Sequence, residues 1–213
     1  MLKIHGAPGS PFVRKVLVVL DEKQVPYELD PVFPFGVSAE FKKISPLGKI
    51  PALTDNGRSL SDSSVICAYL ERIHPEPAMV PSDPYEYARA LWFDEYADTA
   101  MVQVLGAKIF FQRVVGPRFL NQPTDEAMVT KAITEELPPI FDYLESQLGA
   151  GGHFAGGRFS VGDIAVASQL VNLRYAGVEV DASCWPKLAG FFATTVARPS
   201  FAKRLEEERA LFG

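Results

Sequence analysis

Ser10 and Pro11, near the start of the chain, form the first residue pair whose types and position suit chemistry. They stand in GSPFVRKV, residues 9–16, ahead of apolar residues at helical spacing. Serine is favoured as a helix N-cap and proline as the first helical residue. A hydroxyl there lies among unpaired backbone N–H groups at the positive end of the helix dipole, which lowers a nearby thiol pKa from about 8.5 toward neutrality. Capping alone is the commoner role of such a serine, so this segment by itself does not decide between capping and stabilising a thiolate.

A proline at a strand start marks the second segment, SPLGKIPAL, residues 45–53. Pro51 follows a loop and opens a strand, which fits either an edge position or a cis peptide bond. A cis Ile50–Pro51 bond would leave the N–H and C=O of Ile50 free to pair with an extended peptide. An ordinary strand-initiating proline is an equal alternative on these residues alone.

An acidic residue followed by serine marks the third segment, SLSDSSVICAYL, residues 59–70. Ser63 is placed to start a helix, where its amide and hydroxyl suit a carboxylate. Asp62 beside it suits an ammonium. An anion site next to a cation acceptor fits an amino-acid-like group, although simple helix capping explains the same residues.

The elements that position these segments alternate between strand and helix. Asn56-Gly57 is a strong hairpin signal between two short strands. A βαβ unit followed by a ββα unit predicts a four-stranded mixed sheet flanked by helices. We expect strands over 2–5, 27–32, 52–55 and 58–61, and helices over 11–23, 38–44 and 63–73.

A change in character at HPEPAMVPSDP, residues 74–84, predicts a boundary, because four prolines deny both helix and sheet. We expect an α/β domain over residues 1–76, a linker over 77–84 and an all-helical domain over 85–213. In the latter, Ser160 and Asp163 have the spacing of a capping box before an apolar run. Its helices are expected over 85–115, 125–148, 161–175, 186–196 and 199–212.

Composition excludes several classes of partner. The net charge is -5 and no basic stretch occurs, so we expect no nucleic-acid partner. The longest apolar run, residues 16–20, is too short to cross a bilayer, and the first residues lack the pattern of a signal peptide. The two cysteines and three histidines lack the spacing of a disulfide framework or a metal site. A cytoplasmic location and no metal are expected.

The ordered set of segments resembles the glutathione-transferase family over essentially the whole chain. SPFVRKV, GKIPAL and the Asp62-Ser63 pair resemble its thioredoxin-like N-terminal domain, and the Pro-rich linker and helical remainder are similar to its all-α C-terminal domain. The Ser160–Asp163 capping box matches as well. Ser-Pro-Phe resembles the serine-type classes, tau- and theta-like, and many bacterial relatives. Asp62 stands where the family commonly has Glu, and the Ser-Ser-Cys signature of maleylacetoacetate isomerases is missing.

The resemblance implies a glutathione transferase with glutathione as co-substrate. Ser10 is then expected to donate a hydrogen bond to the sulfur, so that the thiolate attacks a hydrophobic electrophile. A cis Pro51 would let the Ile50 backbone pair with the cysteinyl part, while Asp62 and Ser63 hold the γ-glutamyl end. Lys49 is the candidate for the glycine carboxylate.

Other readings share the same resemblance. One is a non-catalytic binding or regulatory module that keeps the fold. Another is glutathione-dependent peroxidase, isomerase or dehalogenase action, which the same thiolate serves. The family resemblance also implies a homodimer, with no membrane partner.

Overall fold

The structure is a computed structural model that describes residues 1–212 of the 213-residue chain. The chain divides into two compact units. The first comprises Met1–Met79 together with the C-terminal segment that begins at Arg198, and the second comprises Val80–Ala197. This division differs from the predicted 85–213 domain at its end, because the last helix belongs with the first unit.

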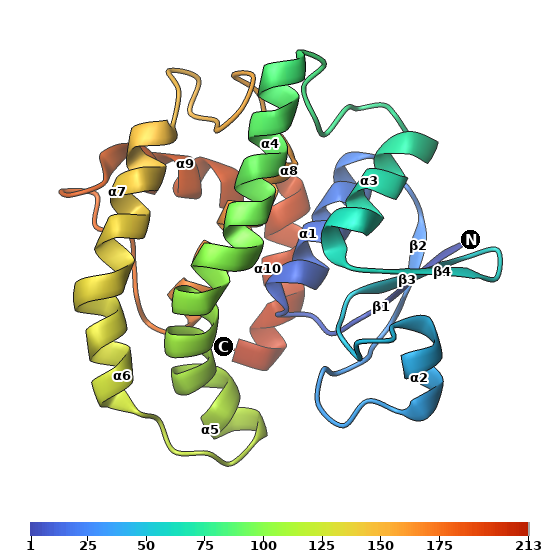
Figure 1. Ribbon diagram of the computed structural model, residues 1–213, viewed down its shortest axis with the longest axis horizontal. Coiled ribbons are helices and arrows are strands. Elements are labelled where there is room, and N and C mark those ends of the chain that lie inside the picture. The colour runs from blue at the N-terminus through green and yellow to red at the C-terminus, as the bar shows by residue number, and fades with distance from the viewer. Residues whose placement is uncertain (213) are drawn as a thin grey trace. The chain divides into compact units, whose positions relative to one another are not determined.

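The first unit is built on a four-stranded sheet in the order β2-β1-β3-β4 (Figure 1). Strand β1 runs parallel to β2 and antiparallel to β3, and β3 pairs antiparallel with β4. The predicted mixed sheet and thioredoxin-like fold are confirmed. The elements are β1 (Leu2–His5), α1 (Pro11–Glu22), β2 (Tyr27–Asp30), α2 (Ala39–Ile44), β3 (Ala52–Asp55), β4 (Arg58–Ser61), α3 (Ser63–Ile73) and α10 (Pro199–Phe212).

Local sequence explains the hairpin and the buried side of the sheet. Asn56 and Gly57 both have positive φ, 48° and 79°, as a tight two-residue hairpin requires. In β1, Ile4 pairs with Leu53 of β3, and both side chains are buried in the core. Residues two apart on a strand point to the same face, so this register fixes which side chains enter the core.

His5 connects three strands on the other face of the sheet. Its Nδ1 lies 2.8 Å from an Asp30 carboxylate oxygen in β2, and its Nε2 lies 2.9 Å from the Thr54 hydroxyl in β3. The ring is buried and meets Phe41 of α2 edge-on. These contacts satisfy both ring nitrogens, which a buried polar ring requires.

The second unit is entirely helical in its described residues, as predicted. Helix α8 is its centre, because every residue from Val161 to Leu173 is buried. A helix that is buried on all sides packs on several neighbours, and α4 and η1 are among its main contacts. The elements are α4 (Pro84–Tyr96), η1 (Ala97–Val115), α5 (Gly116–Phe119), α6 (Glu126–Lys131), η2 (Ala132–Glu136), α7 (Leu137–Gln147), α8 (Val161–Tyr175) and α9 (Pro186–Val196).

Helix α4 and the segment η1 form one long continuous helix. Helix α4 continues without interruption into η1, a π-helical segment in which the amide of Gly116 bonds to the carbonyl of Phe111.

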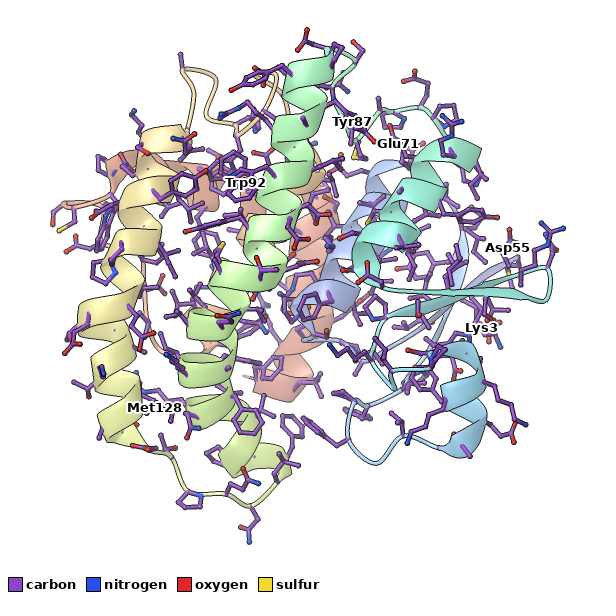
Figure 2. All side chains as sticks on the ribbon, viewed as in Figure 1. Lys3, Asp55, Glu71, Tyr87, Trp92 and Met128 are labelled. Atoms are coloured by element: carbon purple, nitrogen blue, oxygen red, sulfur yellow. The ribbon has the colours of Figure 1, made fainter. Side chains whose placement is uncertain are left out.

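Figure 2 shows Trp92 on the side of α4 that faces α7, where its Nε1 donates to the Tyr143 hydroxyl at 2.6 Å. None of the helices described in residues 1–212 combines the length and apolarity that spanning a membrane requires.

Candidate functional site

The register of the sheet brings the three candidate segments to one end of the first unit. His5, the last residue of β1, lies opposite Ala52, the first residue of β3. Ala52 in turn lies opposite Ser61, the last residue of β4. The loop that leads to Ser10 follows β1, and Pro51 precedes β3. Because Asp62 follows β4, all three segments leave neighbouring positions at the same end of the sheet.

Ser10 is the N-cap of α1. Its backbone is extended, and its Oγ accepts the Val13 N–H at 3.4 Å, with Pro11 as the first helical residue. A hydroxyl has one proton to donate and two lone pairs. Capping therefore uses a lone pair and leaves the proton available, so the capping role and a sulfur-stabilising role are compatible.

Gly9 fixes the path of the loop before Ser10. Its φ is +87°, a left-handed conformation that favours glycine. A Cβ at this position would lie 2.4 Å from ring atoms of Phe212 in α10. The loop that presents Ser10 therefore depends on both the backbone freedom of glycine and its lack of a side chain.

The Ile50–Pro51 bond is cis, as the resemblance implied. The Ile50 side chain is buried, while Lys49 before it is exposed. Within residues 1–212 we find no hydrogen bond to the Ile50 backbone. The Ser45 hydroxyl donates to the Lys49 carbonyl at 2.7 Å and holds the loop. An extended peptide is the kind of partner with which such an unpaired stretch of backbone forms hydrogen bonds.

Asp62, and not Ser63, caps helix α3. The Asp62 Oδ1 accepts the N–H groups of Ser64 and Val65 at 3.0 and 3.1 Å. Asp62 is exposed and has φ +85°, while Ser63 is the buried first residue of the helix. The two residues therefore differ in exposure and in role, although both stand at the helix N-terminus where the sequence placed them.

A buried lysine that the sequence analysis did not single out reaches the same helix start. Lys15 of α1 is fully buried, and its Nζ donates to the Ser64 hydroxyl at 3.1 Å. A positive charge there adds to the positive end of the α3 dipole and favours an anion at that terminus. The sequence shows only two adjacent basic residues, Arg14 and Lys15, in this helix, and nothing in it indicates that Lys15 is buried.

Helix α1 is also held by polar contacts with α10 and with Arg198, the residue just before it. Arg14 and Glu208 form a buried bidentate pair, with Nε–Oε1 and Nη2–Oε2 distances of 2.9 and 2.6 Å. At the other end of α1, Glu22 accepts from Arg198 and Ser200. Burial raises the pKa of Glu22, but the hydrogen bonds from Arg198 and Ser200 outweigh it and the net pKa is lowered. Sequence reasoning missed these pairs because their partners are almost the whole chain apart.

Ser160 and Asp163 start helix α8, which belongs to the second unit. The Asp163 Oδ2 accepts both the amide and the hydroxyl of Ser160 at 2.8 Å, and Oδ1 accepts the Phe154 amide at 3.1 Å. Both residues are fully buried. This arrangement contains the capping box and also ties down the loop before the helix.

Comparison with known proteins decides the family. Residues 4–78 match the model of the glutathione S-transferase N-terminal domain, and residues 127–205 match that of the C-terminal domain. The chain belongs to the glutathione S-transferase family. A glutathione S-transferase of Hyoscyamus muticus is 27% identical over 213 residues, which is 96% of this chain and 98% of the relative.

Solved glutathione S-transferase structures agree with this family assignment. Glutathione transferase F2 from Populus trichocarpa has a TM-score of 0.85 at 26% identity, covering 99% of this chain and 100% of that one. A glutathione S-transferase from Methylobacterium radiotolerans, in complex with glutathione sulfonate, has a TM-score of 0.77 at 28% identity, covering 95% and 93%. The expected family and two-part fold are thereby confirmed.

Proposed function

We propose that this glutathione S-transferase family member binds glutathione at the end of its sheet and activates the thiol with Ser10. The Ser10 hydroxyl donates its proton as a hydrogen bond to the sulfur, and the thiol proton leaves to solvent. A sulfur lone pair then forms the bond to a hydrophobic electrophile as its leaving group or π-bond electrons depart. The observation that most supports this is the half-buried Ser10 cap, whose proton is not used in holding α1.

The remaining segments supply contacts for the rest of the tripeptide in this proposal. The Ile50 backbone before the cis Pro51 pairs with the cysteinyl unit. Asp62 accepts the γ-glutamyl ammonium, and the Ser63 amide at the α3 terminus receives its carboxylate. The exposed Lys49 contacts the glycine carboxylate. The buried Lys15 ammonium supports the anion site from behind by favouring negative charge near Ser64.

The deciding experiment compares Ser10→Ala with a matched cap variant, Ser38→Ala. Ser38 caps α2 in the same way, with its hydroxyl accepting the Phe41 amide at 3.1 Å. Both variants lose a cap, but only Ser10→Ala removes the proposed sulfur donor. We expect Ser10→Ala to lower conjugation by roughly 10- to 100-fold, as for a hydrogen bond to a charged group, and to raise the pKa of bound glutathione. Thiolate absorbance against pH measures that pKa.

Two results would contradict this proposal. If Ser10→Ala keeps full turnover on every electrophile that the wild type accepts, Ser10 has no role in activating the sulfur. If calorimetry shows no glutathione binding by the wild type, the chain is a non-catalytic member of the family. Adding hydroperoxides and isomerisable substrates to the electrophile panel separates conjugation from peroxidase and isomerase action.

We further propose that the protein works as a homodimer in the cytoplasm. Large apolar side chains are exposed on α4 of the second unit, and a monomer gains nothing from this exposure. They are Tyr85, Tyr87, Leu91 and Trp92. Sedimentation equilibrium of the full chain should give twice the monomer mass of 23.4 kDa, and Leu91→Glu should shift it toward the monomer. A wild type that sediments as a monomer at all concentrations contradicts this.

A further inference from the structure

A cavity lies wholly within the first unit, and Pro8 of the loop before Ser10 stands at its edge. It has a volume of about 650 Å³ and is bordered by the end of α1, by β2 and by α10. Figure 1 labels these three elements. The apolar side chains of Leu20, Val25 and Leu29 form part of its wall, and Ser10 is not among its lining residues. A cavity of this size suits a small organic molecule.

One wall of this cavity carries hydrogen-bond donors that the fold does not use. Arg204 is 3% exposed and lines the cavity, and its Nη2 has no hydrogen-bond partner among residues 1–212. Its Nη1 donates to the Tyr27 hydroxyl oxygen at 2.7 Å. That bond occupies a lone pair of Tyr27 and leaves the hydroxyl proton available. A buried donor left unpaired is costly, so a ligand that accepts from the Arg204 guanidinium gains affinity.

The charges around Arg204 indicate what kind of acceptor fits. Its Nε lies 3.1 Å from an Asp21 carboxylate oxygen, and its Nη1 lies 3.0 Å from one of Glu207. Lys203 lies 2.9 Å from the other Asp21 oxygen. Two cations and two carboxylates therefore cancel at this wall. An anionic ligand would meet two carboxylates already in place, whereas a neutral carbonyl oxygen would meet donors without repulsion.

We propose that this cavity is a second binding site, for a small molecule that presents an uncharged carbonyl oxygen on an apolar body. The oxygen accepts from Tyr27 and from the Arg204 guanidinium, and the apolar body lies against Val25 and Leu29. Burial is the largest influence on Tyr27 and raises the pKa of its phenol. The carboxylates of Asp21 and Glu207 raise this pKa further, and Arg204 lowers it without reversing the shift. The hydroxyl therefore stays protonated and can donate. The site is independent of the proposed glutathione chemistry.

Three probes of similar shape test this site. Acetophenone carries the carbonyl, ethylbenzene lacks the oxygen, and benzoate carries a charge. Each is titrated into the full chain with excess S-hexylglutathione present, and amide shifts are followed by NMR at Val25, Tyr27 and Leu29. We expect acetophenone to shift these amides and to bind about 2- to 10-fold more tightly than ethylbenzene or benzoate, the range of one or two hydrogen bonds.

Variants of the wall separate the site from general effects. Tyr27→Phe should weaken acetophenone about 2- to 10-fold and leave ethylbenzene unchanged. Tyr69→Phe is the matched control, because its hydroxyl donates to Asp55 at 2.6 Å, away from the cavity (Asp55 is labelled in Figure 2). Val25→Phe should abolish binding by filling the space. Equal affinity for acetophenone and ethylbenzene, tighter binding of benzoate, or an unchanged Tyr27→Phe overturns the proposal.

Discussion

Two helices of this protein begin with a serine before an apolar run, and the two serines are used differently. Ser160 is fully buried, and its hydroxyl donates to the Asp163 carboxylate at 2.8 Å. Ser10 is half-buried, and its hydroxyl accepts the Val13 amide at the longer distance of 3.4 Å. Both serines are helix N-caps, but the hydroxyl proton of Ser160 is used in a hydrogen bond to Asp163, whereas that of Ser10 is available to donate.

The difference teaches that a cap becomes a candidate for chemistry through what surrounds it. At α8 the carboxylate of Asp163, three residues into the helix, accepts the Ser160 hydroxyl proton and the amides of Ser160 and Phe154. These donors are therefore not available to a ligand. At α1 no acidic residue stands in the first turn. Its positive dipole end and the Ser10 proton are therefore both left for a ligand.

The largest expected effect comes from removing the carboxylate that saturates α8. Asp163→Ala leaves the buried amides of Ser160 and Phe154 without an acceptor, so we expect a loss of roughly 3–5 kcal/mol in the free energy of unfolding. Urea denaturation followed by circular dichroism measures it. Asp181→Ala is the control, since Asp181 accepts the Ser183 amide and hydroxyl on the surface, where water replaces it. A similar loss in both variants would break the contrast.

Gly9→Ala should disturb the other helix start. The new methyl meets the Phe212 ring and the backbone has positive φ, so we expect a loss of about 1–3 kcal/mol in stability. Gly57→Ala isolates the backbone effect, because Gly57 has φ +79° and no atom within 4 Å of an added Cβ. Thermal melts should therefore place Gly9→Ala below Gly57→Ala. Turnover of Gly9→Ala should also fall, because the loop carries Ser10; equal melts for both glycine variants would contradict the packing argument.

Replacing Ser160 or Ser10 with alanine should have a smaller effect on stability, and the two variants should differ in the opposite order in activity. Ser160→Ala should cost about 1–2 kcal/mol in stability, while Ser10→Ala should cost about 0.5–1 kcal/mol. Activity should reverse this order, falling with Ser10→Ala and staying near wild type with Ser160→Ala. Paired urea denaturation and turnover measurements on the same samples check both. Loss of activity in proportion to loss of stability would make Ser10 a cap and nothing more.

The far end of α1 gives the smallest expected effect and a pH dependence. The folded pKa of Glu22 is lowered because the hydrogen bonds from Arg198 and Ser200 outweigh the opposing effect of burial. A depressed folded pKa contributes stability at pH values above the usual glutamate range near 4.3 and loses it as the pH falls below. Glu22→Gln should thus melt below the wild type at pH 7, with the gap closing toward pH 3. A gap independent of pH would contradict this assignment.

Local signals in the sequence account for much of the fold. The Asn56-Gly57 turn, the proline at Pro186 and the apolar run after Ser160 gave boundaries for β3, β4, α8 and α9 that agree with the structure. Each depends on residues within one turn of the boundary. The cis bond before Pro51 came from family resemblance, because its residues alone allowed two conformations.

Long-range contacts account for what the sequence did not reveal. Arg14 and Lys15 read as ordinary basic residues of a helix until the fold placed Glu208 and Ser64 beside them. Asp62 caps α3 because its carboxylate accepts the amides of Ser64 and Val65, and its positive φ has no signal in the neighbouring residues. The cavity beside Arg204 is likewise made by elements that meet only in the folded chain.

The return of α10 to the first unit sets an order for biosynthesis. Arg14 is among the first residues to leave the ribosome, yet its buried partner Glu208 is made 194 positions later. A nascent chain that stops at Met79 therefore exposes a guanidinium whose counter-ion has not been translated. The unit that begins the chain therefore lacks its last helix until the whole of the second unit has been synthesised.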